Sequence, residues 1–328
     1  MEHFQTRSSM KITPKVSRSQ ESAISSFFNE SRIIQDWSIF NYEEIPGERK
    51  RLDLENEISE GVEAELEGSE EKEKDDDETE QDGDIEDSEK LDDITLNRSQ
   101  LARSRANNLP ELLLMGRCNV GKSSLINALL TNNRQNVKTY AKVRQRAGYT
   151  LCLNFYNIGG MFRIVDSPGY GQKGKQWQGE LVFQYLQNRR VMRNCYLMLD
   201  SKVGLNQYDE LIINNLVQLG VPFDVVFNKI DKIPNGHEIE HLENLIDNSI
   251  LAELKIQPRY YFVNSVDTSK GIGYRSGISE LRLGMIESCG LSVNRKSLRP
   301  VKRSREAEEK LKRRKLKNVK MIVNTPKD

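Results

Sequence analysis

One stretch near the middle of the chain decides the fold: Gly116-Arg117-Cys118-Asn119-Val120-Gly121-Lys122-Ser123. It fits the pattern G-x-x-x-x-G-K-[S/T], follows a short apolar run at 111–115 and opens an amphipathic segment at 122–130. Glycine lets a loop wrap closely around phosphate oxygens, and the loop N–H groups and the helix N-terminus supply partial positive charge. We therefore predict a phosphate-binding loop in which Lys122 reaches the β and γ phosphates of a nucleotide and the Ser123 hydroxyl ligates Mg²⁺.

On both sides of this loop, short apolar runs alternate with amphipathic stretches. The patterns predict strands at 111–115, 150–158, 161–165, 195–199, 223–227 and 260–263, and helices at 122–130, 177–190, 209–219, 238–254 and 278–288. The strands 150–158 and 161–165 are joined by Gly159-Gly160, which indicates a hairpin. We expect an α/β fold of the P-loop NTPase (Ras-like) class, with a mostly parallel sheet, helices on both faces and ligands beyond the carboxyl ends of the strands.

A second motif, Asp166-Ser167-Pro168-Gly169, directly follows the second strand of the hairpin. An Asp at this place can hold Mg²⁺ through its water shell, and the Gly169 N–H is placed to sense the γ-phosphate. Alone, the pattern usually marks an ordinary turn. Its position 43 residues after Ser123, at the end of a strand, favours the functional interpretation.

A third motif, Asn228-Lys229-Ile230-Asp231, follows the strand 223–227. A carboxylate can accept two hydrogen bonds from guanine N1–H and the 2-amino group, a donor pair that adenine lacks, and a site that leaves buried polar groups unpaired rejects the wrong ligand strongly. Asn228 then braces the loop and touches the base, and the stem of Lys229 covers the base face. The alternative is a charged loop, but the order of the three motifs favours guanine recognition.

Two weaker candidates complete the predicted site. Thr150 could close over Mg²⁺ and the γ-phosphate, although it could also be an ordinary threonine at the start of a strand. Asn264-Ser265-Val266 follows the strand 260–263, and the Ser265 backbone could contact guanine O6, although a serine at the end of a strand is common.

The charge of the chain is divided between two regions that flank the predicted domain. The 49 basic and 49 acidic residues cancel overall, but 43–93 holds 25 acidic and 6 basic residues and 295–320 holds 13 basic and 3 acidic ones. A segment that is so charged and so poor in large apolar residues cannot bury enough surface to fold. We therefore expect residues 1–105 to be mostly disordered, 109–291 to form the nucleotide-binding domain and 292–328 to be a basic tail.

Other features of the composition limit the compartment. The four cysteines, Cys118, Cys152, Cys195 and Cys289, lack metal-ligand spacing and are expected to be reduced. No run of about 18 apolar residues is present, so no membrane span is expected. Residues 3–20 contain four Lys and Arg residues, several Ser and Thr and no acid, which is the composition of a transit peptide within 1–20 or, equally, of a solvated tail.

The motifs resemble those of the TRAFAC-class GTPases, and specifically of the EngB (YihA) family. The segments that carry the resemblance are 110–129, 147–150 with 153–155, and 165–171, and it extends over about 109–291. Cys118 stands where the family usually has Ser, and Asn264-Ser265 replaces the usual Ser-Ser. Neither change removes a required group, because the backbone makes the contacts there. The family lacks the long acidic stretch 43–93, so no role for it is implied.

The motifs and the resemblance together define the predicted site. The catalytic set is Lys122, Asn119, Thr150 and Gly169, and the metal ligands are Ser123, Thr150 and Asp166. The nucleotide contacts are Gly116, Arg117, Cys118, Asn119, Val120, Gly121, Lys122, Ser123, Ser124, Asp166, Gly169, Asn228, Lys229, Asp231, Asn264, Ser265 and Val266. The expected ligands are GTP or GDP and Mg²⁺. K⁺ is a further candidate because an Asn at the position of Asn119 helps to hold that ion in related GTPases, although the amide of Asn119 could instead brace the loop.

The resemblance implies a GTP-hydrolysing switch that assists assembly of the large ribosomal subunit, and mitochondria as its location because eukaryotic relatives are organellar. Tyr170 stands where many GTPases have Gln, so slow hydrolysis completed by a partner is expected. The basic tail is expected to bind rRNA through its phosphates. The alternative is a GTP-binding scaffold or RNA-binding protein whose hydrolysis is incidental, with a nuclear address at Lys302-Arg303 and 312–315.

Overall fold

The computed structural model describes residues 11–12, 16–53, 108–131, 140–141, 151–171, 176–234, 236–266, 275–294 and 298–300. The chain forms two compact units, one made of Met1–Phe40 and Leu109–Asp328 and the other of Asn41–Asn108. In the second unit the described part contains a short 3-10 helix, η1 (Tyr42–Glu44), and a helical turn at 48–53. Tyr42 Oη donates to Glu48 Oε2 at 2.7 Å, and Arg51 pairs with the same carboxylate.

The first unit is built on an eight-stranded sheet with the order β1-β8-β7-β6-β3-β5-β4-β2. The strands in that order are β1 (Lys11–Ile12), β8 (Arg259–Val263), β7 (Phe223–Asn228), β6 (Met192–Asp200), β3 (Glu111–Gly116), β5 (Phe162–Asp166), β4 (Leu153–Ile158) and β2 (Ile33–Ile39). All neighbours pair in parallel from β1 to β5, whereas β4 is antiparallel to both β5 and β2. The carboxyl ends of β3, β5, β6, β7 and β8 therefore meet at one edge of the sheet.

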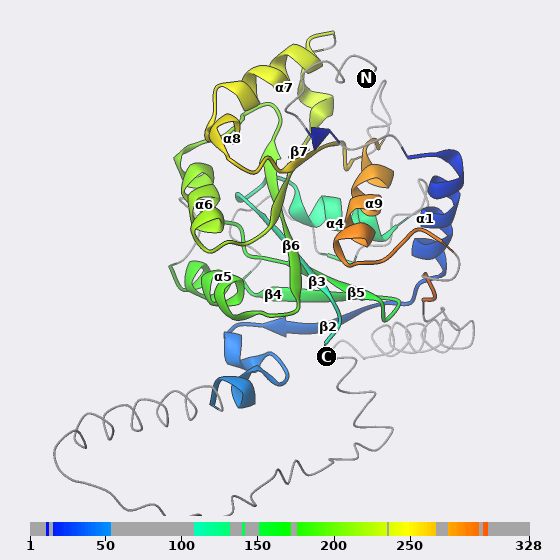
Figure 1. Cartoon of the computed structure of the whole chain (residues 1–328), viewed down its shortest axis with the longest axis vertical. Coiled ribbons are helices and arrows are strands. Elements are labelled where there is room, and N and C mark those ends of the chain that lie inside the picture. The colour runs from blue at the N-terminus through cyan, green and yellow to red at the C-terminus, as the bar shows by residue number, and fades with distance from the viewer. Residues whose placement is uncertain are drawn as a thin grey trace, which may run out of the picture. The chain divides into compact units, whose positions relative to one another are not determined.

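Helices cover both faces of this sheet (Figure 1). One face carries α4 (Lys122–Leu130), α9 (Ile278–Ser288) and α1 (Arg18–Glu30), and α5 (Gln176–Asn188) and α6 (Gln207–Gln218) lie on the other. The remaining helices are η2 (Ile230–Lys232), α7 (Glu238–Asp247) and α8 (Ile250–Glu253). The core contains buried apolar side chains from both layers, such as Leu112 and Leu114 of β3 and Leu125 of α4. The predicted α/β fold is thus confirmed.

The predicted elements of the central domain agree with the structure to within a few residues, with one exception. The predicted helix 238–254 is two helices, because α7 ends at Asp247 and α8 begins at Ile250. Ser249 is the N-cap of α8, and its hydroxyl accepts a hydrogen bond from the Leu251 N–H at 3.3 Å. Ser at an N-cap satisfies a backbone donor that would otherwise lack a partner, so the sequence Asn248-Ser249 favours a new start over a continuous helix.

The expectation of disorder before residue 105 is wrong for the segment that contains α1 and β2. Helix α1 begins with a capping box, in which the Ser17 hydroxyl accepts from the Gln20 N–H at 3.3 Å and the Gln20 side chain accepts from the Ser17 N–H at 3.0 Å. Phe27 and Phe28 are buried and contact the ring of Phe162 on β5. The strongly acidic composition farther along concealed this short apolar pattern. Residues 54–107 and 301–328 lie outside the described residues.

The position of strand β2 shows where the acidic stretch 43–93 lies relative to the strands of the sheet. Ile39, at the end of β2, pairs with Leu153 at the start of β4, whose next residue Asn154 pairs with Asp166. The chain therefore leaves the first unit at the edge where the carboxyl ends of the parallel strands meet, and it returns to the sheet at Glu111, the first residue of β3. The stretch 43–93 is thus part of an insertion between β2 and β3 rather than of an N-terminal tail.

Candidate nucleotide site

The phosphate-binding loop joins β3 to α4, as predicted, and its compact shape depends on two glycines. A Cβ on Gly116 would lie 2.8 Å from the carbonyl oxygen of Met198 and from Val120 Cγ1. Gly121, the N-cap of α4, has φ 106°, and a Cβ there would overlap the side-chain amide of Asn228. Only glycine fits both positions, because one lacks space and the other also has a left-handed backbone.

A buried pair of opposite charges lies at the base of this loop. Lys122 is 7% exposed, and its Nζ donates to the carbonyl oxygens of Gly116 and Arg117 at 2.7 and 3.3 Å. Asp166, at the carboxyl end of β5, is 2% exposed. Burial raises the pKa of Asp166 to about 6 against the opposing charge of Lys122, and burial also lowers the pKa of Lys122. Burial therefore disfavours the charged form of each group, and the attraction between Lys122 and Asp166 offsets only part of this effect.

The Oδ1 atom of Asp166 is buried, and no group in the described part of the chain forms a hydrogen bond with it. Such an atom costs free energy unless a ligand satisfies it. Mg²⁺ prefers oxygen ligands and is usually held by one or two carboxylates together with phosphates and water. Ser123, in the first turn of α4, adds a hydroxyl beside Lys122. The donor set fits Mg²⁺, and within the described part of the chain no cluster of three His, Cys, Asp or Glu offers a different kind of metal site.

The predicted guanine loop is tied to the phosphate loop by the side chain of Asn228. Its Nδ2 donates to the Val120 carbonyl at 2.9 Å, and its Oδ1 accepts from the Ser265 hydroxyl at 2.9 Å. Lys229, with φ 65°, donates through Nζ to the Asn119 carbonyl at 2.8 Å. Asn228 and Lys229 thus connect three loops that are more than 30 residues apart along the chain.

The remaining predicted residues occupy the same edge. Asp231 is exposed in η2, so its carboxylate is accessible to a base. Asn264 is buried and its Oδ1 accepts from the Val266 N–H at 3.1 Å, which shapes the loop after β8. Ser124 follows Ser123 in α4, and both are partly exposed. Ser265 was predicted to act through its backbone, and in the structure its hydroxyl also braces Asn228.

The DxPG motif lies directly against the phosphate loop. A Cβ on Gly169 would be 3.0 Å from Cys118 Cα and Sγ, so this close approach favours glycine. The side chain of Tyr170 turns toward α6, where its hydroxyl donates to Asp209 Oδ1 at 2.7 Å. The expectation that Tyr170 does not orient water as a Gln would stays a prediction. The predicted role of Thr150 lies outside the described residues.

Two residues that sequence reasoning missed belong to the site. Asp200, at the end of β6, forms an ion pair of 2.7 Å with Lys229. Burial by itself would raise the pKa of Asp200, but the hydrogen bond and charge of Lys229 outweigh burial and leave that pKa below its usual value. Ser201 donates through its backbone N–H and its hydroxyl to the Asn228 carbonyl at 2.9 and 2.7 Å. Both residues lie at the carboxyl end of the buried strand β6. Their position suggests a role in the site only once the order of the strands in the sheet is known.

Comparison with known proteins places this geometry in a family. The family described as "50S ribosome-binding GTPase" matches residues 111–229. "MIOREX complex component 8" of Saccharomyces cerevisiae is 36% identical over 200 residues, which are 61% of this chain and 62% of that protein. "Probable GTP-binding protein EngB" of Lactobacillus helveticus is 43% identical over 146 residues, which are 43% of this chain and 72% of that protein.

Among solved structures, that of a probable GTP-binding protein engB is 20% identical, has a TM-score of 0.35, and matches over 55% of this chain and 98% of its own. None of the helices in the described part of the chain combines the length and the apolarity that a membrane span needs.

Proposed function

The chain belongs to the EngB family of GTP-binding proteins, and on that premise we propose that it is a magnesium-dependent GTP-hydrolysing switch that assists assembly of the large subunit of the mitochondrial ribosome. One observation gives the strongest support to the proposal of a GTP-hydrolysing switch. Among the described residues, no group forms a hydrogen bond with Oδ1 of the buried Asp166 carboxylate, which lies with the buried ammonium of Lys122 at the base of the phosphate-binding loop. This arrangement suits a ligand that brings both phosphate and a divalent cation.

The residues of the loop provide the electrostatics of the reaction. Lys122 and the N–H groups at the start of α4 face the phosphates and stabilise the charge that grows on the oxygen between the β and γ phosphorus atoms. Ser123, Asp166 and Thr150 are the proposed holders of Mg²⁺, which neutralises phosphate charge when it is bound. The Gly169 N–H, held against Cys118, is the proposed contact to the γ-phosphate. Because Tyr170 points to α6, we expect a group of the partner to orient the attacking water.

Guanine recognition is assigned to the loops after β7 and β8. The exposed carboxylate of Asp231 accepts from the base, the stem of Lys229 covers one face of it, and the Ser265 backbone contacts O6. Asn228 keeps these loops in register with the phosphate loop through its bond to the Val120 carbonyl at 2.9 Å. A purine without the matching donors leaves Asp231 unpaired, which costs affinity.

The proposed partner is ribosomal RNA of the large subunit. The family description names the 50S ribosome, and the segment 295–320 carries 13 basic and 3 acidic residues. Such a segment neutralises phosphates and gains affinity through the release of counterions. This proposal rests on the resemblance and on the sequence of that segment, which lies almost entirely outside the described residues.

The proposed location is the mitochondrion, because the resemblance implies an organellar protein and residues 3–20 have the composition of a transit peptide. Strand β1 pairs with β8 in parallel, and Ser17 caps α1. Removal of the whole segment 1–20 would therefore delete β1 and the cap of α1. We place any processing before Lys11, which N-terminal sequencing of the protein from isolated mitochondria would test.

The first experiment measures GTP hydrolysis with and without purified large ribosomal subunits from mitochondria. We expect stimulation by the subunits and its loss in Lys122→Ala, whereas Lys202→Ala, which removes an exposed lysine, should hydrolyse GTP like the wild type. Nucleotide binding without stimulation would leave a GTP-binding protein but would contradict the ribosomal role. A chain that binds no guanine nucleotide would contradict the switch itself.

A second function is favoured by the orientation of Tyr170, because the described part of the site offers no side chain that orients water. In that case the chain is a GTP-binding scaffold, nuclear or mitochondrial, whose hydrolysis is incidental. Cells that lack the protein separate the two proposals. Rescue by a folded Lys122→Ala variant supports the scaffold, and failure of that variant supports the switch.

Potassium is the proposed additional cofactor. Asn119 lies in the phosphate loop with φ 66°, and its side chain is exposed at the site. If this amide helps to hold K⁺ beside the phosphates, hydrolysis should be at least about tenfold faster in KCl than in NaCl at the same ionic strength, since removal of one preorganised group that stabilises the developing charge costs about 100- to 1,000-fold in rate. Asn119→Ala should remove the difference. Equal wild-type rates in the two salts would contradict this role.

A further inference from the structure

A third buried carboxylate, Asp209, lies beside the site and is not part of any predicted motif. It is in the first turn of α6 and is 0% exposed. Its Oδ1 accepts from Tyr170 Oη at 2.7 Å, and its Oδ2 lies 3.1 Å from Arg117 Nε. Oδ2 also accepts from the Asn206 N–H at 2.9 Å. A single side chain thus joins α6 to the phosphate loop and to the DxPG motif.

Helix capping alone does not account for these contacts. Asn206 and Asp209 form a capping box, which already satisfies the N-terminal donors of α6. Tyr170 and Arg117 come from two other loops, and both add bonds to a carboxylate that the cap had already engaged. Burial raises the pKa of Tyr170 well above its usual value, so its hydroxyl remains protonated as a donor. A buried, charge-assisted bond of this kind is about twice as strong as a neutral one.

These side-chain contacts fix the backbone that faces the nucleotide site. The Cys118 N–H donates to the Tyr170 carbonyl at 3.2 Å, and Cys118 Sγ donates to the Gly169 carbonyl at 3.4 Å. Arg117 and Tyr170 also form an isolated parallel bridge. With both loops bound to Asp209, the Gly169 N–H can take only a narrow range of positions relative to the phosphate loop.

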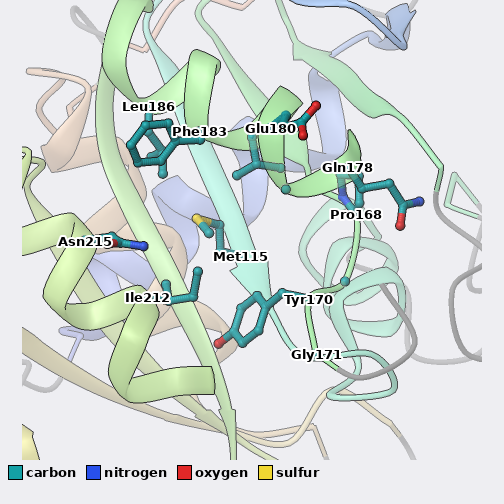
Figure 2. Close-up of a pocket in the computed structure, with 13 residues that line it drawn as sticks. Met115, Pro168, Tyr170, Gly171, Gln178, Glu180, Phe183, Leu186, Ile212 and Asn215 are labelled. Carbon is teal, nitrogen blue, oxygen red and sulfur yellow. The ribbon is translucent and has the colours of Figure 1, made fainter. Parts of the chain in front are cut away.

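The apolar surroundings of Tyr170 do not hold it by packing alone. Its ring borders a cavity of about 450 Å³ between α5 and α6, lined by residues such as Met115, Phe183 and Ile212. Figure 2 shows the Tyr170 ring at one end of this cavity beside Ile212, with its hydroxyl directed away from Gln178. Because open space adjoins the ring on this side, the bond to Asp209 restrains its direction where packing does not.

We propose that Asp209 is a positioning residue for GTP hydrolysis and that Tyr170, Asp209 and Arg117 form a latch, which holds the Gly169 N–H where it meets the γ-phosphate. The inference rests on the proposed function, since only a protein that binds both GTP and GDP can use such a latch. GDP has no γ-phosphate. Loss of the latch therefore weakens binding and hydrolysis of GTP and leaves the affinity for GDP unchanged.

The test compares Tyr170→Phe, which removes one hydroxyl, with Tyr208→Phe, which changes an exposed tyrosine on the same helix as Asp209. Affinities for GDP and for a non-hydrolysable GTP analogue are measured by titration, together with the rate of hydrolysis at saturating GTP. For Tyr170→Phe we expect the preference for the GTP analogue over GDP, and the hydrolysis rate, to fall about tenfold, which corresponds to the loss of one bond to a charged group. Tyr208→Phe should match the wild type.

Asp209→Asn and the double variant extend the test. If the two residues act together, the effect of Asp209→Asn combined with Tyr170→Phe is smaller than the product of the single effects. Equal loss of GDP and GTP affinity in Tyr170→Phe, or no change in either, would overturn the latch even if Asp209→Asn fails to fold. A wild-type chain that binds neither nucleotide overturns the proposed function and the latch together, whereas a normal wild type with an unaltered Tyr170→Phe variant overturns the latch alone.

Discussion

Glu111 and Asp166 are buried carboxylates at opposite ends of two neighbouring parallel strands, and their surroundings differ. Glu111 begins β3 and is 0% exposed, and it accepts from Arg189 at 2.6 and 2.8 Å, from Tyr185 at 2.8 Å and from Arg163 at 3.4 Å. Asp166 ends β5, and its Oδ1 has no partner. Burial of a carboxylate costs free energy in both cases. At Glu111, hydrogen bonds from protein side chains offset this cost. At Asp166, we propose that a bound ligand offsets it.

The network around Glu111 also fastens the N-terminal strand. Arg163 donates through Nε to Asp36 Oδ2 at 2.9 Å, and its guanidinium lies 4.2 Å from the ring centroid of Trp37. Both partners are in β2. The network around Glu111, at the end of the sheet opposite the motifs, therefore also holds β2, the strand that precedes the insertion. At the end of the sheet with the motifs, the Oδ1 atom of Asp166 has no hydrogen-bond partner among the described residues.

The largest expected effect is on stability, from Glu111→Gln. This change removes the negative charge that two buried guanidinium groups share, and loss of one partner of a buried ion pair costs about 3–5 kcal/mol of unfolding free energy. Urea denaturation measures the difference. The matched control is Glu210→Gln, an exposed glutamate on α6, with an expected change below about 0.5 kcal/mol. A loss no greater than that of the control would show that the network is not what holds this edge.

Next in size is the effect of Asp166→Asn on catalysis. We expect hydrolysis of GTP at saturating Mg²⁺ to fall by about 100-fold or more, in the range seen when one electrostatic group of an active site is removed. The affinity for GDP measured without Mg²⁺ should change little, because the proposed role of Asp166 is to hold the ion. If Asp166→Asn hydrolyses GTP at more than a third of the wild-type rate, the proposal that Asp166 holds Mg²⁺ is contradicted.

The last effect concerns stability at pH 8, where substitution of Asp166 and substitution of Glu111 should change the free energy of unfolding in opposite directions. The pKa of Asp166 is about 6 in the folded protein and 3.8 ordinarily, so the folded state binds the proton more tightly and ionisation opposes folding. Without nucleotide, Asp166→Asn should therefore unfold with a free energy up to about 3 kcal/mol higher than the wild type at pH 8. The difference should disappear as the pH falls from 6 to 4.

This measurement also has a clear contrary result. If Asp166→Asn is less stable than the wild type at pH 8, Lys122 supplies more stabilisation than burial removes, and the site at Asp166 resembles that at Glu111. The variant Glu111→Gln, in the same pH series, should remain less stable than the wild type at pH 8.

Local sequence patterns predicted those site residues whose position follows from the strand or helix next to them in the sequence. The phosphate loop, Asp166 and the loop at Asn228 follow strands that are short and apolar, so their place at one edge of the sheet could be deduced from the amino-acid sequence alone. The contacts of Glu111 could not, because its partners lie 52 to 78 residues away. Asp200 required the strand order, with β6 between β3 and β7. The direction of Tyr170 depended on α6, which no motif marks.

The N-terminal elements show a different limit of sequence analysis. The composition of 43–93 dominates any average over the first 105 residues and suggests an unstructured tail. Ile24, Phe27 and Phe28 are buried against the sheet nonetheless, because three well-spaced apolar side chains on one helix face are enough to dock a capped helix.

The insertion of 43–93 between β2 and β3 has a consequence for the integrity of the chain. A protease that cuts once within 54–107 would produce two fragments, one of them carrying β1, α1 and β2 and the other the strands of the large sheet from β3 onward. No covalent bond would then join them, but the ladder between β2 and β4, the docked aromatic rings of α1 and the ion pair of Arg163 with Asp36 would remain. The nicked protein would be a non-covalent heterodimer, able to come apart and reassemble as an intact chain cannot.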